Sequence, residues 1–190
     1  MIKVDIIEIA GFASALKALR LPFSKECRSE CNHNYYTQKK HYSEVCLCTD
    51  TTCVINEKDI ALMSTLVRRG DEHSKVVRGL IAYMDIEAPV YWWCELETYR
   101  AGHERLSSQS TMHVEGKGLS GDELVEVKSQ IPMGKMLRKI DFFSYQCLRN
   151  IVKQRHNHRL PEWKVFIDKL HSLPYAEELI FTGLNQNNNE

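Results

Sequence analysis

Two stretches of the chain alternate apolar with polar residues, which is the pattern of a β-strand that buries one face. Residues 2–6 alternate in this way before Gly11 interrupts the segment. Residues 80–86 alternate more regularly, with Leu80, Ala82, Met84 and Ile86 on one side. The pattern therefore predicts two strands that lie far apart in the sequence.

Helical spacings of three and four residues occupy much of the remaining chain. They predict five helices. The first covers 13–20, the second runs from an Asn56 cap to Gly70, and the third starts at Gly121 after a Ser120/Glu123 capping box. The fourth covers 135–155, and the fifth starts at Pro161. The predicted helix over 135–155 ends in a basic turn that contains Lys153, Arg155, His156, His158 and Arg159. These cations either offset the helix dipole or form a pocket for a phosphate or carboxylate.

Residues 85–113 join the second strand to a segment that combines aromatic and polar side chains. Pro89 suits the first turn of a helix, because it lacks only an amide hydrogen that would be unpaired there. We expect Tyr91, Trp92 and Cys94 to lie mainly in the core, and the chain then continues with Arg, His, Ser, Gln and Thr. A rigid apolar helix followed by such groups predicts a binding site for a small anionic molecule.

Residues 23–55 show neither the alternation of a strand nor the spacing of a helix, which predicts a functional loop, a small hairpin or a metal-pinned lobe. A tetrahedral zinc ion takes four soft ligands, and the candidate ligands are Cys27, Cys31, Cys46, Cys48 and Cys53. Reduced thiols in a variable loop are the alternative, because two CxxC pairs are lacking. The polar tail at 185–190 is predicted to be disordered.

The overall charge favours neither nucleic acid nor an anionic membrane as a partner. Lysine plus arginine (25) equals aspartate plus glutamate (25), so non-specific nucleic-acid binding is disfavoured. No run approaches the roughly 18 to 20 apolar residues of a membrane span, and polar residues interrupt the start where a signal peptide is apolar. We therefore expect a soluble cytoplasmic protein that forms one domain over residues 1–190, with 23–55 as an insertion or lobe.

Several common enzyme motifs are absent from the sequence. It contains no GxxxxGK[ST], GxGxxG, HExxH or GxSxG motif. The sequence thus gives no support to a P-loop kinase, a Rossmann dehydrogenase, a zinc protease of the HExxH type or a serine hydrolase. Cys94 and Cys147 lie in apolar helical segments, where a thiol is usually inert.

The order of elements over 56–170 resembles that of the flavin-dependent thymidylate synthases, the ThyX family. Ala88-Pro89 stands where that family has an Ala-Pro dipeptide before an aromatic helix, and Ile131-Pro132 is similar to its Leu-Pro. Glu162-Trp163 follows as a Gln-Trp-Glu segment does there, and the interval 132–155 fits without a gap. The resemblance implies an α+β fold with a small antiparallel or mixed sheet, a long helix and flanking helices. It also implies a homo-oligomer, which is a tetramer in that family.

The same resemblance implies a site for a nucleotide and for FAD. Carried over position by position, it assigns nucleotide binding to Arg100, Ser108, Ser110, Lys128 and Arg155. It assigns cofactor binding to Tyr99, Asn150 and His158. Arg100, Lys128 and Arg155 would surround one phosphate, within one subunit or across an oligomer contact. Tyr99 would stack on a base.

The signature of the family is altered in this chain. Thr98 and Tyr99 replace an Arg and a His, and Arg105-Leu106 replaces an Asn-Glu. Asp71 falls near the family's flavin-contacting His, where a carboxylate would repel the flavin diphosphate.

Two hypotheses follow for the function. The first is a nucleotide-binding protein that acts as a flavin-dependent methyl or one-carbon transferase on a pyrimidine nucleotide similar to dUMP. The second is a non-catalytic phage protein that sequesters a nucleotide or binds a host protein. Residues 107–113 resemble a segment of phage-borne relatives of the family, which implies a viral or prophage origin and a location in the host cytoplasm.

Overall fold

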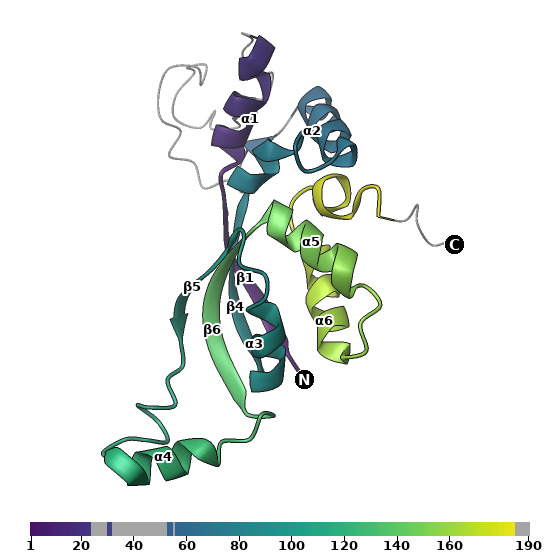
Figure 1. The fold of residues 1–190 in the computed structure, drawn as a ribbon. Coiled ribbons are helices and arrows are strands. Elements are labelled where there is room, and N and C mark those ends of the chain that lie inside the picture. The colour runs from purple at the N-terminus through teal and green to yellow at the C-terminus, as the bar shows by residue number, and fades with distance from the viewer. Residues whose placement is uncertain (24–29, 32–52, 55, 185–190) are drawn as a thin grey trace.

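A four-stranded antiparallel sheet runs through the middle of the molecule (Figure 1). The strand order is β1 (Lys3–Ala10), β4 (Ile81–Pro89), β6 (Met136–Ser144) and β5 (His103–Ser108). The alternating residues predicted the second strand correctly, since Ala82, Met84, Ile86 and Ala88 of β4 are fully buried. The structure is a computed structural model that describes residues 1–23, 30–31, 53–54 and 56–184.

Most of the Cys-rich segment and the tail at 185–190 lie outside the described residues. The described part of the Cys-rich segment includes β2 (Glu30–Cys31) and β3 (Cys53–Val54), which pair antiparallel with Cys31 opposite Cys53. Cys27, Cys46 and Cys48 lie outside the described part, so a zinc-binding lobe and a disordered tail stay predictions.

Three helices cover one face of the sheet in Figure 1, namely α3 (Val90–Leu96), α5 (Tyr145–Arg155) and α6 (Pro161–Leu170). Each has a local reason to begin where it does. Pro89 is the N-cap of α3, the Ser144 hydroxyl accepts a hydrogen bond from the amide of Cys147, and Pro161 opens α6. These helices therefore form one layer on this side of the sheet.

The remaining helices lie mainly at the two ends of the sheet (Figure 1). At one end are α1 (Phe12–Arg20) and α2 (Glu57–Arg69), together with 3-10 turns at Leu21–Phe23 and Lys75–Gly79. The predicted Asn56 cap is confirmed, because its side chain accepts a hydrogen bond from the Lys58 amide. A π-helical turn, Glu177–Phe181, packs against α2 and α5.

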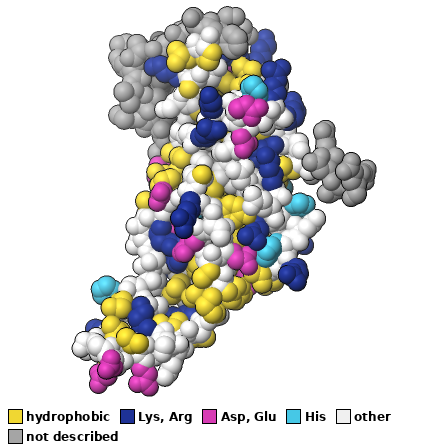
Figure 2. All heavy atoms as spheres, in the orientation of Figure 1, with side chains coloured by type: hydrophobic (Ala, Val, Ile, Leu, Met, Phe, Trp, Pro, Cys, Tyr) yellow, Lys and Arg dark blue, Asp and Glu magenta, His cyan; other side chains and the backbone are white. Residues whose placement is uncertain are grey.

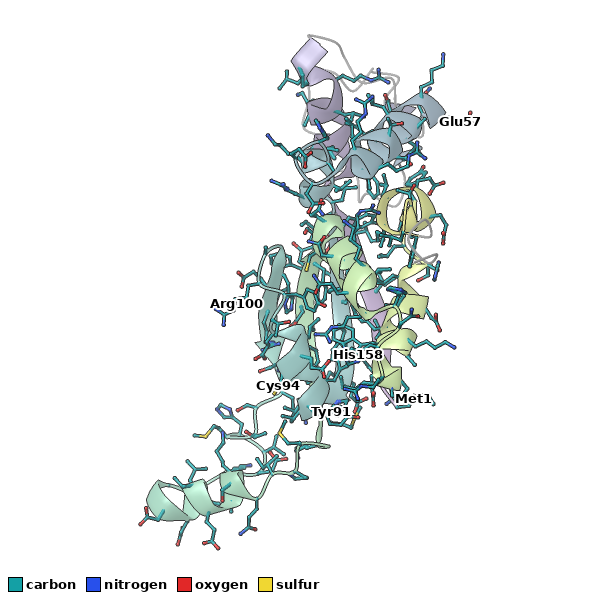
Figure 3. The ribbon with its side chains drawn as sticks, turned by 45° about the vertical axis from the view of Figure 1, so that its right-hand side comes forward. Met1, Glu57, Tyr91, Cys94, Arg100 and His158 are labelled. Carbon is teal, nitrogen blue, oxygen red and sulfur yellow. The ribbon has the colours of Figure 1, made fainter. Side chains whose placement is uncertain are left out.

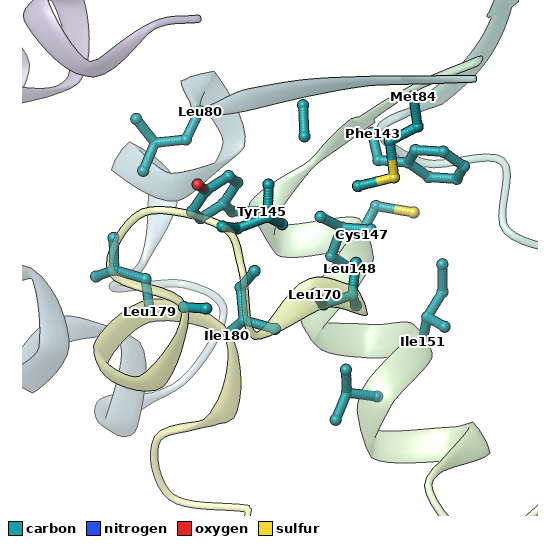
Figure 4. Packing of buried hydrophobic residues seen from close by; sticks show 14 of the residues in the cluster. Leu80, Met84, Phe143, Tyr145, Cys147, Leu148, Ile151, Leu170, Leu179 and Ile180 are labelled. Atoms are coloured by element: carbon teal, nitrogen blue, oxygen red, sulfur yellow. The ribbon is translucent and has the colours of Figure 1, made fainter. Parts of the chain in front are cut away.

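The core lies between the sheet and the helical layer. Trp92, Trp163 and Phe166 are fully buried, and the Trp92 ring centroid lies 4.9 Å from that of Trp163 and 5.5 Å from that of Phe166. Figure 4 shows how the core continues toward the π-helical turn, where Tyr145 and Leu148 of α5 pack near Leu179 and Ile180. This continuous core supports the α3, α5 and α6 side chains that form the candidate site.

The predicted helix over 135–155 is wrong in its first half. Residues Met136–Ser144 form β6, and the helix begins only at Tyr145. Leu137 and Ile140 have a helical spacing, but in the strand they point to opposite faces. Charged Lys139 and Asp141 point inward, and they hide the alternation that would have predicted a strand.

Two features of residues 85–113 also differ from expectation. The polar continuation of the aromatic helix includes an edge strand, β5, which pairs with β6. Cys94 is exposed, whereas it was expected in the core. Tyr91 is half-buried and Trp92 is fully buried, as a helix with one inward face requires.

A helical arm projects from the end of the sheet opposite α1 and α2 (Figure 1). We call residues 109–135 the α4 arm, because they contain α4 (Gly121–Ser129). The helix starts where the capping box predicted, but the Ser120 side chain makes no capping hydrogen bond and α4 has no buried residue. Among the described residues, the structure contains no helix with the length and apolar character of a membrane span.

Candidate functional site

A polar cluster centred on Glu95 lies where α3, α5 and α6 meet. The Oε2 atom of Glu95 accepts a hydrogen bond from Trp163 Nε1 at 2.8 Å. It also lies 3.3 Å from Nη1 of Arg155 and 3.5 Å from Nε2 of His158. The Nε of Arg155 donates to the Tyr99 hydroxyl at 2.9 Å. We call these five residues the Glu95 cluster, and it unites three predicted binding residues, Tyr99, Arg155 and His158.

The guanidinium of Arg155 has a fixed orientation in this cluster. Its central carbon lies 5.0 Å from the ring centroid of Trp163 and 5.7 Å from that of Tyr99. The side chain remains 20% exposed, and in the described part of the chain nothing accepts a hydrogen bond from Nη2. Arg155 can therefore present Nη2 to an oxygen of a ligand anion while Glu95 and Tyr99 hold its other nitrogens.

The hydrogen bonds of His158 indicate which ring nitrogen carries the proton in the neutral imidazole. The backbone amide of Leu160 donates to Nδ1 at 3.2 Å, so the neutral ring carries its proton on Nε2. That nitrogen is the one that faces Glu95. His158 thus supports the position of the carboxylate that orients Arg155.

Behind the Glu95 cluster, His103 connects Tyr99 to the sheet. Its Nδ1 lies 3.1 Å from the carbonyl oxygen of Tyr99, and its Nε2 lies 2.7 Å from Oδ2 of Asp141. Both partners are oxygen atoms that can accept a hydrogen bond from the ring. The imidazole stacks in parallel on Phe143 with centroids 4.5 Å apart. Asp141 is fully buried, and it also accepts a hydrogen bond from Arg105 Nε at 3.2 Å.

The connection continues from Arg105 through Glu97 to Lys139. Arg105 donates to Oε1 of Glu97 at 2.7 Å, and this hydrogen bond lowers the pKa of Glu97. Lys139 Nζ lies 3.4 Å from the same oxygen and 4.4 Å from the ring centroid of Trp93. Burial lowers the pKa of Lys139, and the charge of Arg105 acts in the same direction. We call His103, Asp141, Arg105, Glu97 and Lys139 the buried network.

Ser108 lies beside a separate hollow at the edge of the sheet. This hollow has a volume of about 620 Å³, and its lining includes Ser107, Ser108, Arg138 and Lys139. Arg138 Nε donates to Asp85 at 2.7 Å, and this hydrogen bond lowers the pKa of Asp85. Lys139 therefore belongs both to the lining of this hollow and to the buried network.

The remaining predicted site residues lie apart from the Glu95 cluster in the single chain. Figure 3 shows Arg100 pointing outward, away from His158, and Lys128 lies on the α4 arm. The Ser110 hydroxyl, also on the arm, lies 2.9 Å from Nδ1 of His113.

Asn150 lies on α5 among amides and a carboxylate. Its side-chain oxygen accepts a hydrogen bond from Gln146 Nε2 at 3.3 Å. The same nitrogen donates to Oδ1 of Asp71 at 3.0 Å. The carboxylate that the sequence placed near a flavin-binding position is therefore close to Asn150.

The arrangement of these elements is shared with solved structures. Thymidylate Synthase X (ThyX) from Helicobacter pylori with FAD and dUMP superposes with a TM-score of 0.65, at 13% identity over 98% of this chain and 100% of that chain. A second Helicobacter pylori ThyX structure with FAD and dUMP has a TM-score of 0.64, at 14% identity over 95% of this chain and 98% of that chain. The chain has the ThyX fold.

A related enzyme shares the ThyX fold with this chain. The UMP/dUMP methylase PolB from Streptomyces cacaoi, bound with 5-Br dUMP, has a TM-score of 0.58. Its identity is 12%, and the match covers 93% of this chain and 91% of that chain. No protein-family model and no curated protein sequence matches the chain. The likeness therefore shows the fold, and it confirms the α+β class implied by the sequence resemblance.

The described residues of this ThyX-fold chain contain no group of three or more His, Cys, Asp or Glu side chains arranged to hold a metal ion. The two helical cysteines differ in their surroundings. Cys94 is exposed, whereas burial raises the pKa of Cys147 to about 12. The Cys147 thiol therefore stays protonated and unreactive at neutral pH, as its apolar segment predicted.

Sequence reasoning missed Glu95 and the buried network as parts of the candidate site. Glu95 meets Trp163 across 68 positions of the chain, and His103 meets Asp141 across 38. Local patterns do not report such distant contacts. The available signal was the placement of Lys139 and Asp141 among the apolar residues Leu137, Ile140 and Phe142, since charged residues in such segments are buried only when they are paired.

Proposed function

We propose that this chain binds a pyrimidine nucleoside monophosphate such as dUMP, with Arg155 as a phosphate contact. The observation that carries the proposal is the geometry of Arg155, whose Nε and Nη1 face Tyr99 and Glu95 while Nη2 is open. A guanidinium held in this way binds a phosphate oxygen at a smaller entropic cost than a freely rotating side chain. Support comes from the solved structures of the same fold that hold dUMP or 5-Br dUMP.

We propose that a second copy of the chain completes this site. Arg100 and Lys128 do not approach Arg155 within one chain, and Lys128 lies on a projecting arm whose helix buries none of its own residues. In a homo-oligomer the arm of one copy, with the end of β5 that precedes it, would bring Lys128 and the Ser108 and Ser110 hydroxyls to a neighbouring copy. Three cations and two hydroxyls would then share the phosphate charge.

The residues assigned to FAD fit its diphosphate poorly. The carboxylate of Asp71 lies one hydrogen bond from the amide that contacts Asn150, and it would repel a diphosphate. Tyr99 is only 9% exposed, and its ring packs edge-on against Trp163 at 6.1 Å, so it offers no free face to a flavin ring. FAD in a protein of this fold would supply hydride transfer, but no step of the proposed function passes through it.

This poor fit favours a second candidate function, which is nucleotide binding without catalysis. A protein of that kind would sequester the nucleotide, as the second sequence hypothesis holds. The flavin content of purified protein separates the two candidates. Stoichiometric flavin absorbance supports a flavin-dependent transferase acting on the pyrimidine, whereas a colourless preparation that binds dUMP supports the sequestering protein.

The nucleotide proposal is tested by titrating dUMP into the protein in a calorimeter. Arg155→Ala is expected to weaken dUMP binding about tenfold or more, because it removes a charge-assisted hydrogen bond worth roughly 1.5–3 kcal/mol. Arg159→Ala is the matched control, since Arg159 is exposed, lies close by in the sequence and carries the same charge. A wild-type protein that does not bind dUMP, or an Arg155→Ala variant that binds it unchanged, contradicts the proposal.

A further inference from the structure

A cavity lies on the side of α5 that faces α2 and the end of the described chain. Its volume is about 570 Å³, within the usual range for small-ligand sites. Four basic residues line it, Arg68, Arg149, Lys153 and His156, and none of its described lining residues is acidic. The rest of the lining consists of apolar side chains and glycine. We call this cavity the Arg149 pocket.

The basic residues of α5 reach the Arg149 pocket because of their spacing. The lining residues of α5 occupy one face of the helix, because Val152, Lys153 and His156 lie three, four and seven positions after Arg149. Arg155 lies on another face and contacts Tyr99 instead. The pocket is therefore separate from the Glu95 cluster, although both depend on α5.

Figure 2 shows Lys and Arg side chains gathered at one edge of the molecule, over α2 and α5. Arg68 is exposed on α2 at the rim of the Arg149 pocket. Lys153 contributes a second exposed cation, and it lies 3.8 Å from Asp71, which offsets part of its charge. The rim thus carries a positive charge that attracts anions from solution.

Arg149 is the feature that points to a ligand. The residue is 4% exposed, and within the described residues no carboxylate lies at ion-pair distance from it. Its Nη1 donates to the carbonyl oxygens of Ile180 at 2.9 Å and Thr182 at 2.6 Å, whereas its Nε is buried without a partner. Burial lowers the pKa of this guanidinium. Two carbonyl oxygens hold the side chain in place, but they do not neutralise a buried charge.

Gly183 lines the pocket between Arg68 and Arg149. This residue has φ +71°, and a Cβ built on it would lie 3.5 Å from Cγ of Arg68 and 3.8 Å from Nη2 of Arg149. Both distances are ordinary van der Waals contacts, so the backbone of Gly183 lies next to Nη2 without crowding it. The apolar side chains of Phe181 and Leu184 lie on either side and are half-buried.

We propose that the Arg149 pocket binds a small phosphate monoester. The phosphate would accept hydrogen bonds from Arg149 Nη2, Arg68 and Lys153, and its negative charge would neutralise the buried guanidinium. A dianion suits the pocket better than a monocarboxylate, because three formal positive charges line it and, among the described residues, only Lys153 has a carboxylate at ion-pair distance. That carboxylate, Asp71, acts on Arg149 only from a longer distance. The organic part of the ligand would pack against Phe181 and Leu184.

Phenyl phosphate is a suitable probe, since it joins a phosphate to an apolar ring. Titrated into the full-length protein in a calorimeter, it is expected to bind saturably and more tightly than inorganic phosphate. Arg68→Ala and Lys153→Ala should each weaken its binding about tenfold, the effect of one lost charge-assisted hydrogen bond. Arg69→Ala is the matched control, because Arg69 is exposed next to Arg68 but does not line the pocket.

Three results would overturn the proposal. The first is the absence of saturable binding of phenyl phosphate by the wild-type protein. The second is an equal loss of binding in Arg69→Ala and Arg68→Ala, which would indicate attraction to surface charge alone. The third is loss in Arg155→Ala with Arg68→Ala unchanged, which would assign the binding to the Glu95 cluster. Arg68 and Lys153 are exposed, so both substitutions leave the core intact, and circular dichroism checks their folding.

Discussion

Lys139 is a buried cation whose pKa is lowered by the fold. It is 8% exposed, under the ring of Trp93, and its amine shares Glu97 with Arg105. Burial lowers its pKa relative to the unfolded chain. At pH values between the two pKa values the unfolded chain therefore binds a proton that the native protein does not. The free energy of unfolding rises with pH in that window, which ends near the ordinary lysine pKa of about 10.4.

Lys139→Met is expected to remove this rise while filling a similar volume beneath Trp93. The measurement is urea unfolding of both proteins at several pH values from neutral to alkaline, with the difference in unfolding free energy plotted against pH. Lys164→Met serves as the control, because Lys164 is an exposed lysine on α6 and lies outside the buried network. An unchanged pH slope in Lys139→Met would show that the amine is not desolvated by the fold.

Individual site residues were predictable only where a resemblance supplied them. Tyr99, Arg155 and His158 were assigned by position, and the structure brings them together around Glu95. Glu95 itself gave no signal, because a glutamate in an amphipathic helix ordinarily faces solvent. Its role depends on the indole of Trp163, which only the folded chain brings into contact with it.

At the scale of elements, β6 shows why a strand was mistaken for a helix. Its inward residues are Leu137, Lys139, Asp141 and Phe143, so two of four are charged. Its outward residues include Ile140 and Phe142, which are apolar. The period of two is therefore weak, and Leu137, Ile140 and Ser144 keep helical intervals instead. Helices with clear caps and strands without buried charges, such as α2 and β4, were predicted correctly.

The turn before β5 fixes the start of α5, and two glycines allow a test of this link. Gly102 and Gly118 both have φ +79°, but a Cβ on Gly102 would lie 2.2 Å from Oγ of Ser144, whereas a Cβ on Gly118 would meet nothing within 4 Å. Gly118→Ala is expected to lower the unfolding free energy by about 1 kcal/mol through backbone strain alone. Gly102→Ala should lower it by roughly 1–3 kcal/mol more, because the alanine also displaces the helix cap.

Urea unfolding monitored by circular dichroism measures both glycine variants under one condition. Equal destabilisation would mean that the turn accommodates a methyl group and that the Ser144 cap does not depend on Gly102.

At the scale of the whole molecule, the α4 arm projects from the sheet, and its helix packs little against the rest of the chain. The largest exposed apolar side chains on it are Met112, Val114, Val125 and Met133. A helix of nine residues is marginally stable without tertiary contacts, and α4 has no buried residue. The proposed homo-oligomer would cover this surface, as apolar patches on monomeric proteins are usually small.

Val125→Glu is expected to reduce the mass of the particle in light scattering to that of a smaller oligomer or a monomer. Ile7→Glu is the control, because Ile7 is another exposed apolar residue and lies on β1 outside the arm. If Lys128 acts across the contact, Val125→Glu should also lose dUMP binding. A wild-type protein that is monomeric at assay concentration would contradict the oligomer, and the role of Lys128 with it.

The strand β6 passes directly into α5, because Ser144 both ends the strand and caps the helix. The pleat of the sheet therefore sets the rotational phase of the helix about its own axis. One residue inserted at this joint would rotate everything beyond it by about 100°. Arg155 would turn away from Glu95, and Arg149 would turn away from the carbonyl groups it holds. A homologue or design with a different number of residues at this joint would therefore misplace both Arg155 and Arg149, even if every side chain were retained.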